Sequence, residues 1–174
     1  MSLSAADIMR AFESLEEELS RRGERAEIVI AGGAALVLLF GARETTKDVD
    51  AYFVRPEAAV MREAAARVAA RLELPEDWLN DAAKGYFVGL TSGSHVYDSA
   101  MLTVRTATTI QLFAMKLCAW RDAVDRSDAR LLLSNLEGTK TEIWAQASRF
   151  VPPHLLDKAS YAFDDLWETS NGTA

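Results

Sequence analysis

The stretch of sequence that decides the fold is residues 28–53, which read Ile28-Val-Ile-Ala-Gly-Gly-Ala-Ala-Leu-Val-Leu-Leu-Phe-Gly-Ala-Arg-Glu-Thr-Thr-Lys-Asp-Val-Asp-Ala-Tyr-Phe53. A short apolar run passes through a Gly-Gly step into an apolar segment of helical length, and a polar loop then leads to Asp48-Val49-Asp50. Strand side chains alternate between faces, so the two aspartates point the same way and Val49 points the other way. Their Cα atoms should lie about 6.6 Å apart, close enough for both carboxylates to bind one divalent ion. Because aspartate is disfavoured in strands, this pair indicates a function.

Gly32 and Gly33 lie between the expected strand and the expected helix. Glycine lets a phosphate group approach the backbone N–H groups at a helix N-terminus, although any tight strand-to-helix turn also uses glycine. The segment is neither a Walker A loop nor a Gly-x-Gly-x-x-Gly dinucleotide motif. Together with Asp48 and Asp50, the Gly-Gly step predicts a phosphate cradle beside a metal-binding carboxylate pair.

Composition indicates an ordinary folded domain. The chain has 174 residues, of which 49% are apolar and 26% are charged, and a chain of this size buries a sizeable core without disulfides. The single Cys118 excludes an internal disulfide and a thiolate zinc cluster. A net charge of −7 argues against broad nucleic-acid binding, although a local basic face stays compatible with it. No long uncharged apolar run and no basic leader are present, so we expect a cytoplasmic protein with no membrane partner.

Hydrophobic periodicity and capping residues predict the elements along the chain. Helices are expected at residues 4–22, 34–40, 56–72, 110–123, 128–136, 141–150 and 153–168, with a short helix or turn at 75–81. Strands are expected at residues 27–31, 48–54, 85–90 and 95–105, and disorder at 171–174. This order predicts an α+β fold in which helices flank a small mixed β-sheet and a helical C-terminal part follows. We expect a single domain over residues 1–174, with an α/β core at 1–106 and a helical part at 107–170.

Residues 31–53 resemble the signature of the minimal nucleotidyltransferase fold, the DNA polymerase β superfamily, in which Gly-Gly or Gly-Ser precedes a strand bearing Asp-x-Asp. Gly-Gly-Ala-Ala-Leu followed by Arg43-Glu-Thr-Thr-Lys-Asp-Val-Asp is most similar to the AbiEii-type and MenT-type toxin branch. The helix that carries Lys116 and the later Asp128 are similar to that branch's Lys-bearing helix and the acidic residue after it. Trp78-Leu-Asn-Asp81 is similar to uncharacterised relatives, so the resemblance covers about residues 26–135.

The resemblance implies an enzyme that transfers a nucleoside monophosphate from an NTP, ATP being one candidate, to an acceptor and releases pyrophosphate. Asp48 and Asp50 would hold Mg²⁺, and Gly32 and Gly33 would lie against the triphosphate. Lys116 would pair with a phosphate, and Asp128 would assist the metal site or orient the acceptor. In the toxin relatives the acceptor is typically tRNA, so the resemblance also implies the toxin-like member of a toxin–antitoxin pair, with an antitoxin protein as partner.

Other interpretations of the same residues stay open. Lys116 could equally extend its stem along the surface, Asp125 and Asp128 could cap a helix, and Arg43 could contact phosphate or belong to an ordinary polar loop. Ala34 supplies no hydroxyl for the nucleotide after the second glycine.

Many active members of the superfamily carry a third carboxylate on a later strand. Asp98 is the only candidate, and its early, loop-like position leads us to expect that it does not fill this role. A catalytically degenerate nucleotide-binding module and a purely structural or interaction protein are therefore the alternatives to the enzyme. The enzyme and the binding module both predict metal-dependent nucleotide binding and the structural protein predicts none, whereas pyrophosphate release marks the enzyme alone.

Overall fold

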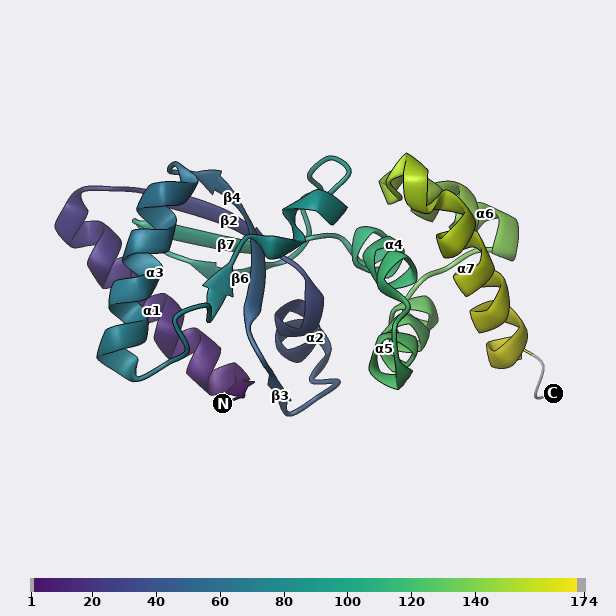
Figure 1. Cartoon of the computed structure of the whole chain (residues 1–174), viewed down its shortest axis with the longest axis horizontal. Coiled ribbons are helices and arrows are strands. Elements are labelled where there is room, and N and C mark those ends of the chain that lie inside the picture. Colours follow the sequence, from purple (N-terminus) through teal and green to yellow (C-terminus); the bar gives the residue numbers. More distant parts are fainter. Residues whose placement is uncertain (1, 172–174) are drawn as a thin grey trace. The chain divides into compact units, whose positions relative to one another are not determined.

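The computed structural model describes residues 2–171, and these form two compact units (Figure 1). The first unit contains the described residues up to Lys84 together with Ser92–Ala107, and the second contains Gly85–Thr91 and the described residues from Thr108 onward. The assignment of residues 1–174 to a single domain stays a prediction.

A five-stranded mixed sheet forms the centre of the first unit, in the order β5-β4-β2-β7-β6. Its middle strand β2 pairs antiparallel with β4 and parallel with β7. Ile28, Val29 and Ile30 of β2 are fully buried, as expected for a central strand covered on both faces. The strands are β2 (Ala26–Ile30), β4 (Val49–Arg55), β5 (Leu79–Asn80), β6 (His95–Asp98) and β7 (Leu102–Thr106).

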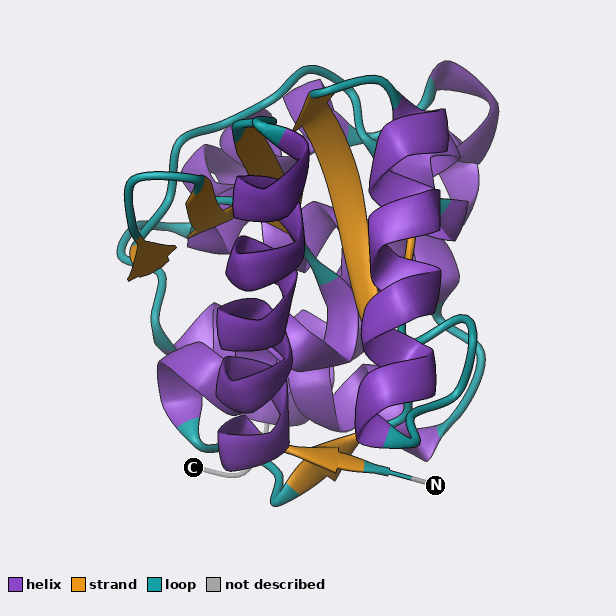
Figure 2. Ribbon diagram, turned by 90° about the vertical axis from the view of Figure 1, so that its left-hand side faces the viewer, coloured by secondary structure: helices purple, strands orange, loops and turns teal. Residues whose placement is uncertain are grey.

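Helices α1 (Ala5–Arg22) and α3 (Ala58–Leu72) lie side by side in this unit and pack on the sheet (Figures 1 and 2). The start of α1 follows the expected chemistry, because Ser4 and Asp7 form a reciprocal capping box. Its end is equally clear, since Gly23 adopts the left-handed conformation at φ 66°. The expected apolar stripe of α1 is fully buried, namely Ile8, Phe12, Leu15 and Leu19.

Helix α2 (Gly32–Phe40) follows β2 directly, and the loop after it is held by a second, two-stranded sheet. In that sheet β3 (Thr45–Thr46) pairs antiparallel with β1 (Leu3–Ser4). Strand β1 thus anchors the segment that leads into Asp48, so part of the expected loop is a short strand.

Three expectations about the first unit differ from the structure. Residues 76 and 77 form the expected turn, but the next residues include the edge strand β5, which pairs parallel with β4. Residues 95–105 form the hairpin β6–β7 instead of one strand, because Ser99 turns the chain by bonding Leu102 through both backbone and side chain. Pro56 precedes α3 without opening it, since Glu57 is the N-cap.

The strand expected at residues 85–90 is absent. The chain there forms the short 3₁₀ helix η1 (Ala82–Tyr86) and then a loop in which Gly89 has φ 71°. The buried side-chain amide of Gln111 donates to the carbonyl oxygens of Val88 and Gly89 at 3.5 and 2.9 Å. These bonds satisfy polar groups that a neighbouring strand would otherwise pair, so an apolar segment resembles a strand without becoming one.

The second unit is helical, with α4 (Thr109–Ala119), α5 (Ala123–Ser134), α6 (Lys140–Ala147) and α7 (Leu156–Asn171). Phe163 of α7 lies at its centre, with ring centroids 5.9 Å from Phe113 and 5.6 Å from Trp144. Short 3₁₀ turns, η2 (Ser148–Phe150) and η3 (Pro153–Leu155), join α6 to α7.

The helix boundaries of this unit differ from expectation. Helix α4 ends at Ala119 because Trp120 adopts φ 36°, and Asp122 caps α5, so residues 125–127 are helical instead of a loop. Helix α6 ends at Ala147, three residues early. Asn171 is the last residue of α7, and the rest of the expected disordered tail, residues 172–174, lies outside the described residues.

The expected fold class is confirmed: helices flank a mixed five-stranded sheet, and a helical C-terminal part follows. Among residues 2–171, no helix has the length and apolar character needed to cross a bilayer.

Candidate functional site

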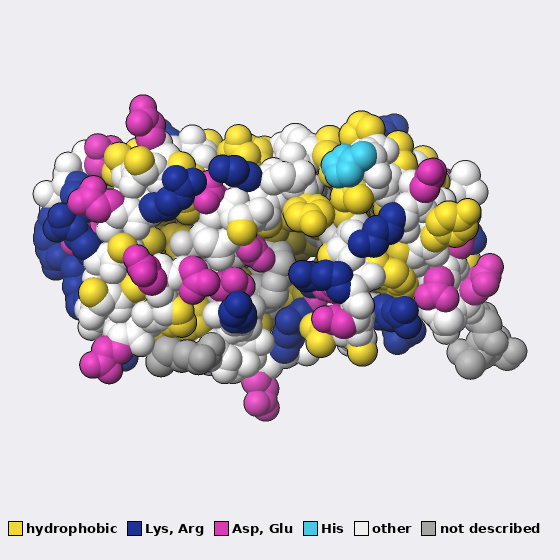
Figure 3. Space-filling view, viewed as in Figure 1, with side chains coloured by type: hydrophobic (Ala, Val, Ile, Leu, Met, Phe, Trp, Pro, Cys, Tyr) yellow, Lys and Arg dark blue, Asp and Glu magenta, His cyan; other side chains and the backbone are white. Residues whose placement is uncertain are grey.

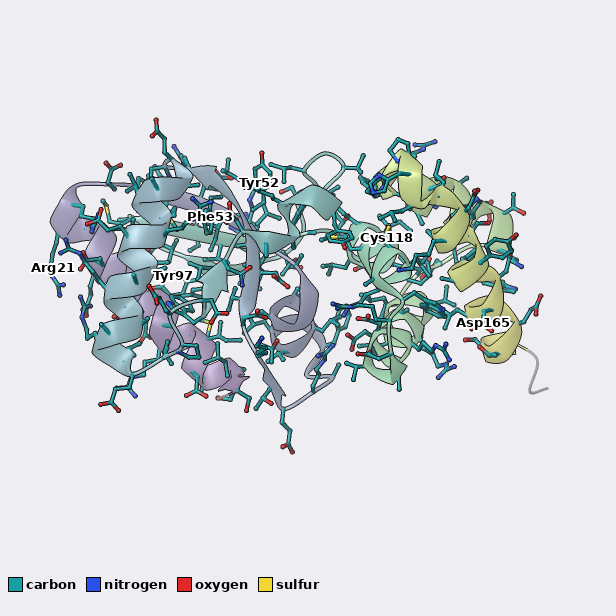
Figure 4. All side chains as sticks on the ribbon, in the orientation of Figure 1. Arg21, Tyr52, Phe53, Tyr97, Cys118 and Asp165 are labelled. Carbon is teal, nitrogen blue, oxygen red and sulfur yellow. The ribbon has the colours of Figure 1, made fainter. Side chains whose placement is uncertain are left out.

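The aspartate pair lies where the chain enters the sheet. Asp50 is the second residue of β4, and Asp48 directly precedes that strand. Both are half-buried, whereas Val49 and Ala51 between and after them are fully buried. This alternation agrees with two carboxylates on one side of the strand and two apolar side chains on the other. Tyr52, labelled with its neighbour Phe53 in Figure 4, continues the same alternation along β4.

The start of α2 lies directly against the Asp50 carboxylate. The backbone N–H of Ala31 donates to the carbonyl oxygen of Asp50 at 2.9 Å, and α2 begins at the next residue. Gly32 has φ 62°, and a Cβ atom at this position would lie 2.8 Å from Asp50 Oδ2. Glycine is therefore required twice at Gly32, for its left-handed backbone and for the close carboxylate.

A hydroxyl and a guanidinium group lie at the first turn of the same helix. A Cβ atom on Gly33 would overlap Thr46 Oγ1 and would lie 3.4 Å from Arg43 Nη1. Thr46 is buried, and its hydroxyl donates to the carbonyl oxygen of Asp48 at 3.2 Å. Ala34 supplies no hydroxyl here, as the sequence indicated, but strand β3 brings the hydroxyl of Thr46 to the same turn.

Asn80 is a site residue that sequence reasoning missed. In the parallel pairing of β4 and β5 it lies opposite Asp50, and its Nδ2 is 3.4 Å from Asp48 Oδ2. The only signal in the sequence was the short run from Trp78 to Asp81, because a two-residue strand is too short to show an alternating pattern.

Burial is the main influence on the charge state of Asp48. It raises the pKa of this carboxyl above its usual value of 3.8, and the nearby negative charge of Asp77 adds to the rise. Lys47 and the hydrogen bond from Asn80 oppose the rise without cancelling it. Asp48 is thus a carboxylate that a bound cation would stabilise.

The donor set suits a divalent ion that arrives with phosphate ligands. No group of three or more His, Cys, Asp or Glu side chains gathers into a metal cage anywhere in residues 2–171. Mg²⁺ in proteins typically binds one or two carboxylates and completes its shell with substrate phosphates and water. Asp48 and Asp50 fit that requirement, with the glycine cradle of α2 directly beside Asp50.

Asp98 lies away from this pair. It belongs to β6, an edge strand, where its Oδ1 accepts a hydrogen bond from Thr103 at 3.0 Å. Strands β2 and β7 separate β6 from β4, a distance of about 14 Å across the sheet. The neighbouring strand on the other side of β4 carries the amide of Asn80 instead of a carboxylate.

Lys116 and Asp128 are brought together in the second unit. The ammonium of Lys116 lies 2.7 Å from Asp128 Oδ2 and 2.9 Å from Asp125 Oδ1. Both carboxylates are almost fully buried, and the Lys116 side chain is only 13% exposed. The surface interpretation of Lys116, with its ammonium in water, is therefore wrong.

The helix-capping interpretation is also wrong for Asp128, which is the sixth residue of α5. Asp122 caps that helix by accepting a hydrogen bond from the backbone N–H of Asp125 at 2.9 Å. Asp125 also binds Arg121, whose Nε and backbone N–H each lie 3.1 Å from Asp125 Oδ2. Lys116 and Arg121 together hold the pKa of Asp125 low, against the effect of burial.

The one cysteine of the chain is buried in the second unit. Cys118, labelled in Figure 4, is 2% exposed, and burial raises the pKa of its thiol to about 11, so it packs as a small apolar residue.

On the face of the molecule shown in Figure 3, acidic and basic side chains are interspersed on each unit. That face presents no single broad basic surface of the kind that non-specific nucleic-acid binding requires.

Gly33→Ala should destabilise the protein by about 1–3 kcal/mol, because the added methyl group overlaps the Thr46 hydroxyl in a packed turn. Urea unfolding followed by circular dichroism measures the change. Gly85→Ala is the matched control, since a Cβ there meets no atom within 4 Å, and it should change stability by less than about 0.5 kcal/mol. Equal stability of the two variants would show that the turn is not packed as described.

Asp48→Asn should raise the melting temperature at pH 7. Because the pKa of Asp48 is raised on folding, the folded state binds more protons than the unfolded chain between the two pKa values. The Asp48 contribution to stability therefore falls as pH rises through that interval, and the asparagine variant avoids this loss. Thermal melts from pH 3 to 8 should show that the melting temperatures of the two proteins converge in acid. If Asp48→Asn is no more stable than the unmodified protein at pH 7, the raised pKa of Asp48 is contradicted.

Lys116→Met should lower the free energy of unfolding by about 3–5 kcal/mol, because it removes a cation shared by two buried carboxylates. Lys158→Met is the control, since exposed Lys158 donates only to the carbonyl oxygen of Ala119 and should matter by about 1 kcal/mol or less. A fully stable Lys116→Met protein would indicate that this ammonium is not committed to the ion pairs.

Comparison with known protein families matches residues 6–93, just over half of the chain, to the family described as "Nucleotidyltransferase of unknown function (DUF6036)". The match includes Gly32, Gly33, Asp48, Asp50 and Asn80, and it ends before Lys116 and Asp128. Neither a search of curated proteins nor a search of solved structures gives a significant match. The expected resemblance is confirmed at the level of the family, without its narrower branch: the chain belongs to the nucleotidyltransferases of unknown function.

Proposed function

We propose that this protein is a Mg²⁺-dependent enzyme that transfers a nucleoside monophosphate from an NTP to an acceptor hydroxyl. The observation that carries the proposal is the contact of Gly32 with Asp50, since it puts a helix N-terminus suited to phosphate beside a carboxylate suited to a cation. Membership of a nucleotidyltransferase family supports the reaction class.

The residues of the first unit would bind the metal ion and the triphosphate. Asp48 and Asp50 would hold Mg²⁺, which neutralises charge on the phosphate oxygens when it is bound. The backbone of Gly32 and Gly33 would lie against the triphosphate, and the guanidinium of Arg43, close to Gly33, would bind its oxygens.

The reaction is an in-line displacement at the α-phosphorus. The acceptor oxygen forms a new bond to phosphorus as the bond to the pyrophosphate oxygen breaks, and the hydroxyl proton leaves to solvent or a nearby base. Because the protein contributes mainly position and charge to such a step, small changes in the orientation of Asp48 or Asp50 should alter the rate strongly.

Lys116 and Asp128 belong to the second unit, and their proposed roles concern the acceptor. By the resemblance Asp128 would orient the acceptor, and Lys116 would hold Asp128 through the 2.7 Å ion pair. Direct pairing of Lys116 with a phosphate, which the toxin relatives suggest, would require it to leave two buried carboxylates.

The cellular role is proposed on resemblance to the AbiEii-type and MenT-type toxins. In this proposal the acceptor is tRNA or protein, the enzyme acts in the cytoplasm as the toxin-like member of a toxin–antitoxin pair, and a separate antitoxin protein restrains it.

A catalytically degenerate nucleotide-binding module is the second candidate. The absence of any cluster of three acidic or other metal-binding side chains in residues 2–171 favours it, because many active relatives carry three carboxylates. Such a module would bind a nucleotide with Mg²⁺ without releasing pyrophosphate.

Label transfer tests the proposal. Each NTP labelled at the α-phosphate is incubated with Mg²⁺ and the protein, with total tRNA and cell protein offered as separate acceptors. Asp48→Ala and Asp50→Ala should each lower transfer by at least about 100-fold, because each removes a ligand of the ion that stabilises the transferred group. Asp98→Ala, which removes an exposed carboxylate of β6, should leave transfer unchanged.

The outcomes separate the candidates. Transfer to one acceptor class that depends on both aspartates supports the enzyme and identifies its substrate. Nucleotide binding that requires Mg²⁺ and Asp50, without transfer, supports the binding module. Neither transfer nor binding would contradict both and leave a structural or interaction role.

A further inference from the structure

We propose that Asn80 is a positioning residue of this site, which orients the Asp48 carboxylate for the metal ion. The inference rests on the proposed function, because it concerns how the same metal-binding pair is held. It adds a residue for which neither the Asp-x-Asp pattern nor the Gly-Gly step gives a role.

Strand pairing brings Asn80 to the site. In the parallel register of β4 and β5, Val49 lies opposite Leu79 and Asp50 lies opposite Asn80. The register is anchored by the backbone N–H of Val49, which donates to the carbonyl oxygen of Trp78 at 2.7 Å. Trp78 is fully buried, and its indole N–H donates to the carbonyl oxygen of Ala65 in α3 at 3.0 Å. A two-residue strand is thereby fixed firmly enough to aim one side chain.

The hydrogen bonds of Asn80 decide which end of its amide faces Asp48. Its Oδ1 accepts from the backbone N–H of Ala82 at 2.9 Å, so Oδ1 must face that donor. Its Nδ2 then lies 3.3 Å from the carbonyl oxygen of Asp77 and 3.4 Å from Asp48 Oδ2, both of which are acceptors. A flipped amide would put oxygen against oxygen twice and nitrogen against an N–H group.

Asn80 therefore acts on Asp48 as a donor. Its long hydrogen bond holds one carboxylate oxygen, Oδ2, and leaves Oδ1 available to the ion. Mutation of a group that orients a metal ligand in this way typically lowers metal affinity or activity by about 10- to 100-fold.

Two of the three hydrogen bonds of Asn80 are local, to Asp77 and Ala82, and only the third crosses to the segment before β4. Asn80→Asp keeps the bond from the N–H of Ala82 and removes the donor, so the bonds to the carbonyl oxygen of Asp77 and to Asp48 are both lost. The new carboxylate would face Asp48 and supply a third anionic oxygen donor to the same ion.

The test measures Mn²⁺ binding to the nucleotide-free protein by electron paramagnetic resonance, together with the rate of transfer at saturating metal and NTP. Asn80→Asp should bind Mn²⁺ about tenfold more tightly, because a third negative charge faces the ion. Its transfer rate should fall about tenfold or more, because Asp48 loses the donor that orients it. Asn80→Ala should lower the rate without tightening Mn²⁺ binding.

Asn135→Asp is the matched control, since Asn135 also donates through Nδ2 to a backbone carbonyl, that of Leu131, but lies at the end of α5 in the second unit. It should change neither quantity. Unchanged Mn²⁺ affinity in Asn80→Asp, with the unmodified protein binding Mn²⁺ and nucleotide normally, overturns this inference alone. An unmodified protein that binds neither overturns the proposed function, and this inference with it.

Discussion

The candidate site depends on one hydrogen bond at the junction of β2 and α2, from the N–H of Ala31 to the carbonyl oxygen of Asp50. It extends the β2–β4 ladder by one residue beyond the pair of Ile30 and Ala51 and fixes the place at which the chain leaves the sheet. The next residue, Gly32, turns through a left-handed conformation and starts the helix against the Asp50 carboxylate. With a Cβ at that position, the helix could not start so close to the carboxylate. Backbone geometry thus sets the position of α2 relative to the strand that carries Asp50.

This junction brings groups of opposite preference together. The first turn of a helix carries partial positive charge and favours anions, whereas a half-buried aspartate pair favours a cation. In the proposed function, a metal–triphosphate complex would satisfy both at once, since its metal would meet the carboxylates and its phosphates would meet the helix and Arg43. Either group alone would satisfy only half of the site. We therefore expect metal and nucleotide to bind cooperatively, each strengthening the affinity for the other.

The sequence predicted best those features that depend on neighbours in the chain. Ser4 and Asp7 cap α1 because a capping box is local. The expected helix after the Gly-Gly step and the expected strand after it are both present, although α2 starts two residues early, at Gly32, and β4 starts one residue late, at Val49. What it missed depends on partners far away in the chain. Strand β5 exists because Trp78 anchors it beside β4, and residues 85–90 avoid a strand because Gln111 binds their carbonyl groups. The sequence also did not predict that Asn80 lies beside Asp48 or that the Thr46 hydroxyl lies beside Gly33, because strand pairing creates both contacts.

Lys116 shows why a matching residue type does not settle a role. A lysine in an apolar helix followed by an aspartate fits the pattern of a phosphate-binding residue, yet here its ammonium is shared by Asp125 and Asp128. To release it to a phosphate, the protein would have to leave two buried carboxylates short of a counter-ion, which costs several kcal/mol. Arg43 Nη1 lies at the first turn of α2, 3.4 Å from the position that a Cβ atom on Gly33 would take. Loss of activity at Lys116 would therefore reflect the fold of the second unit before it reflected phosphate binding, whereas a change at Arg43 would test the proposed phosphate cradle.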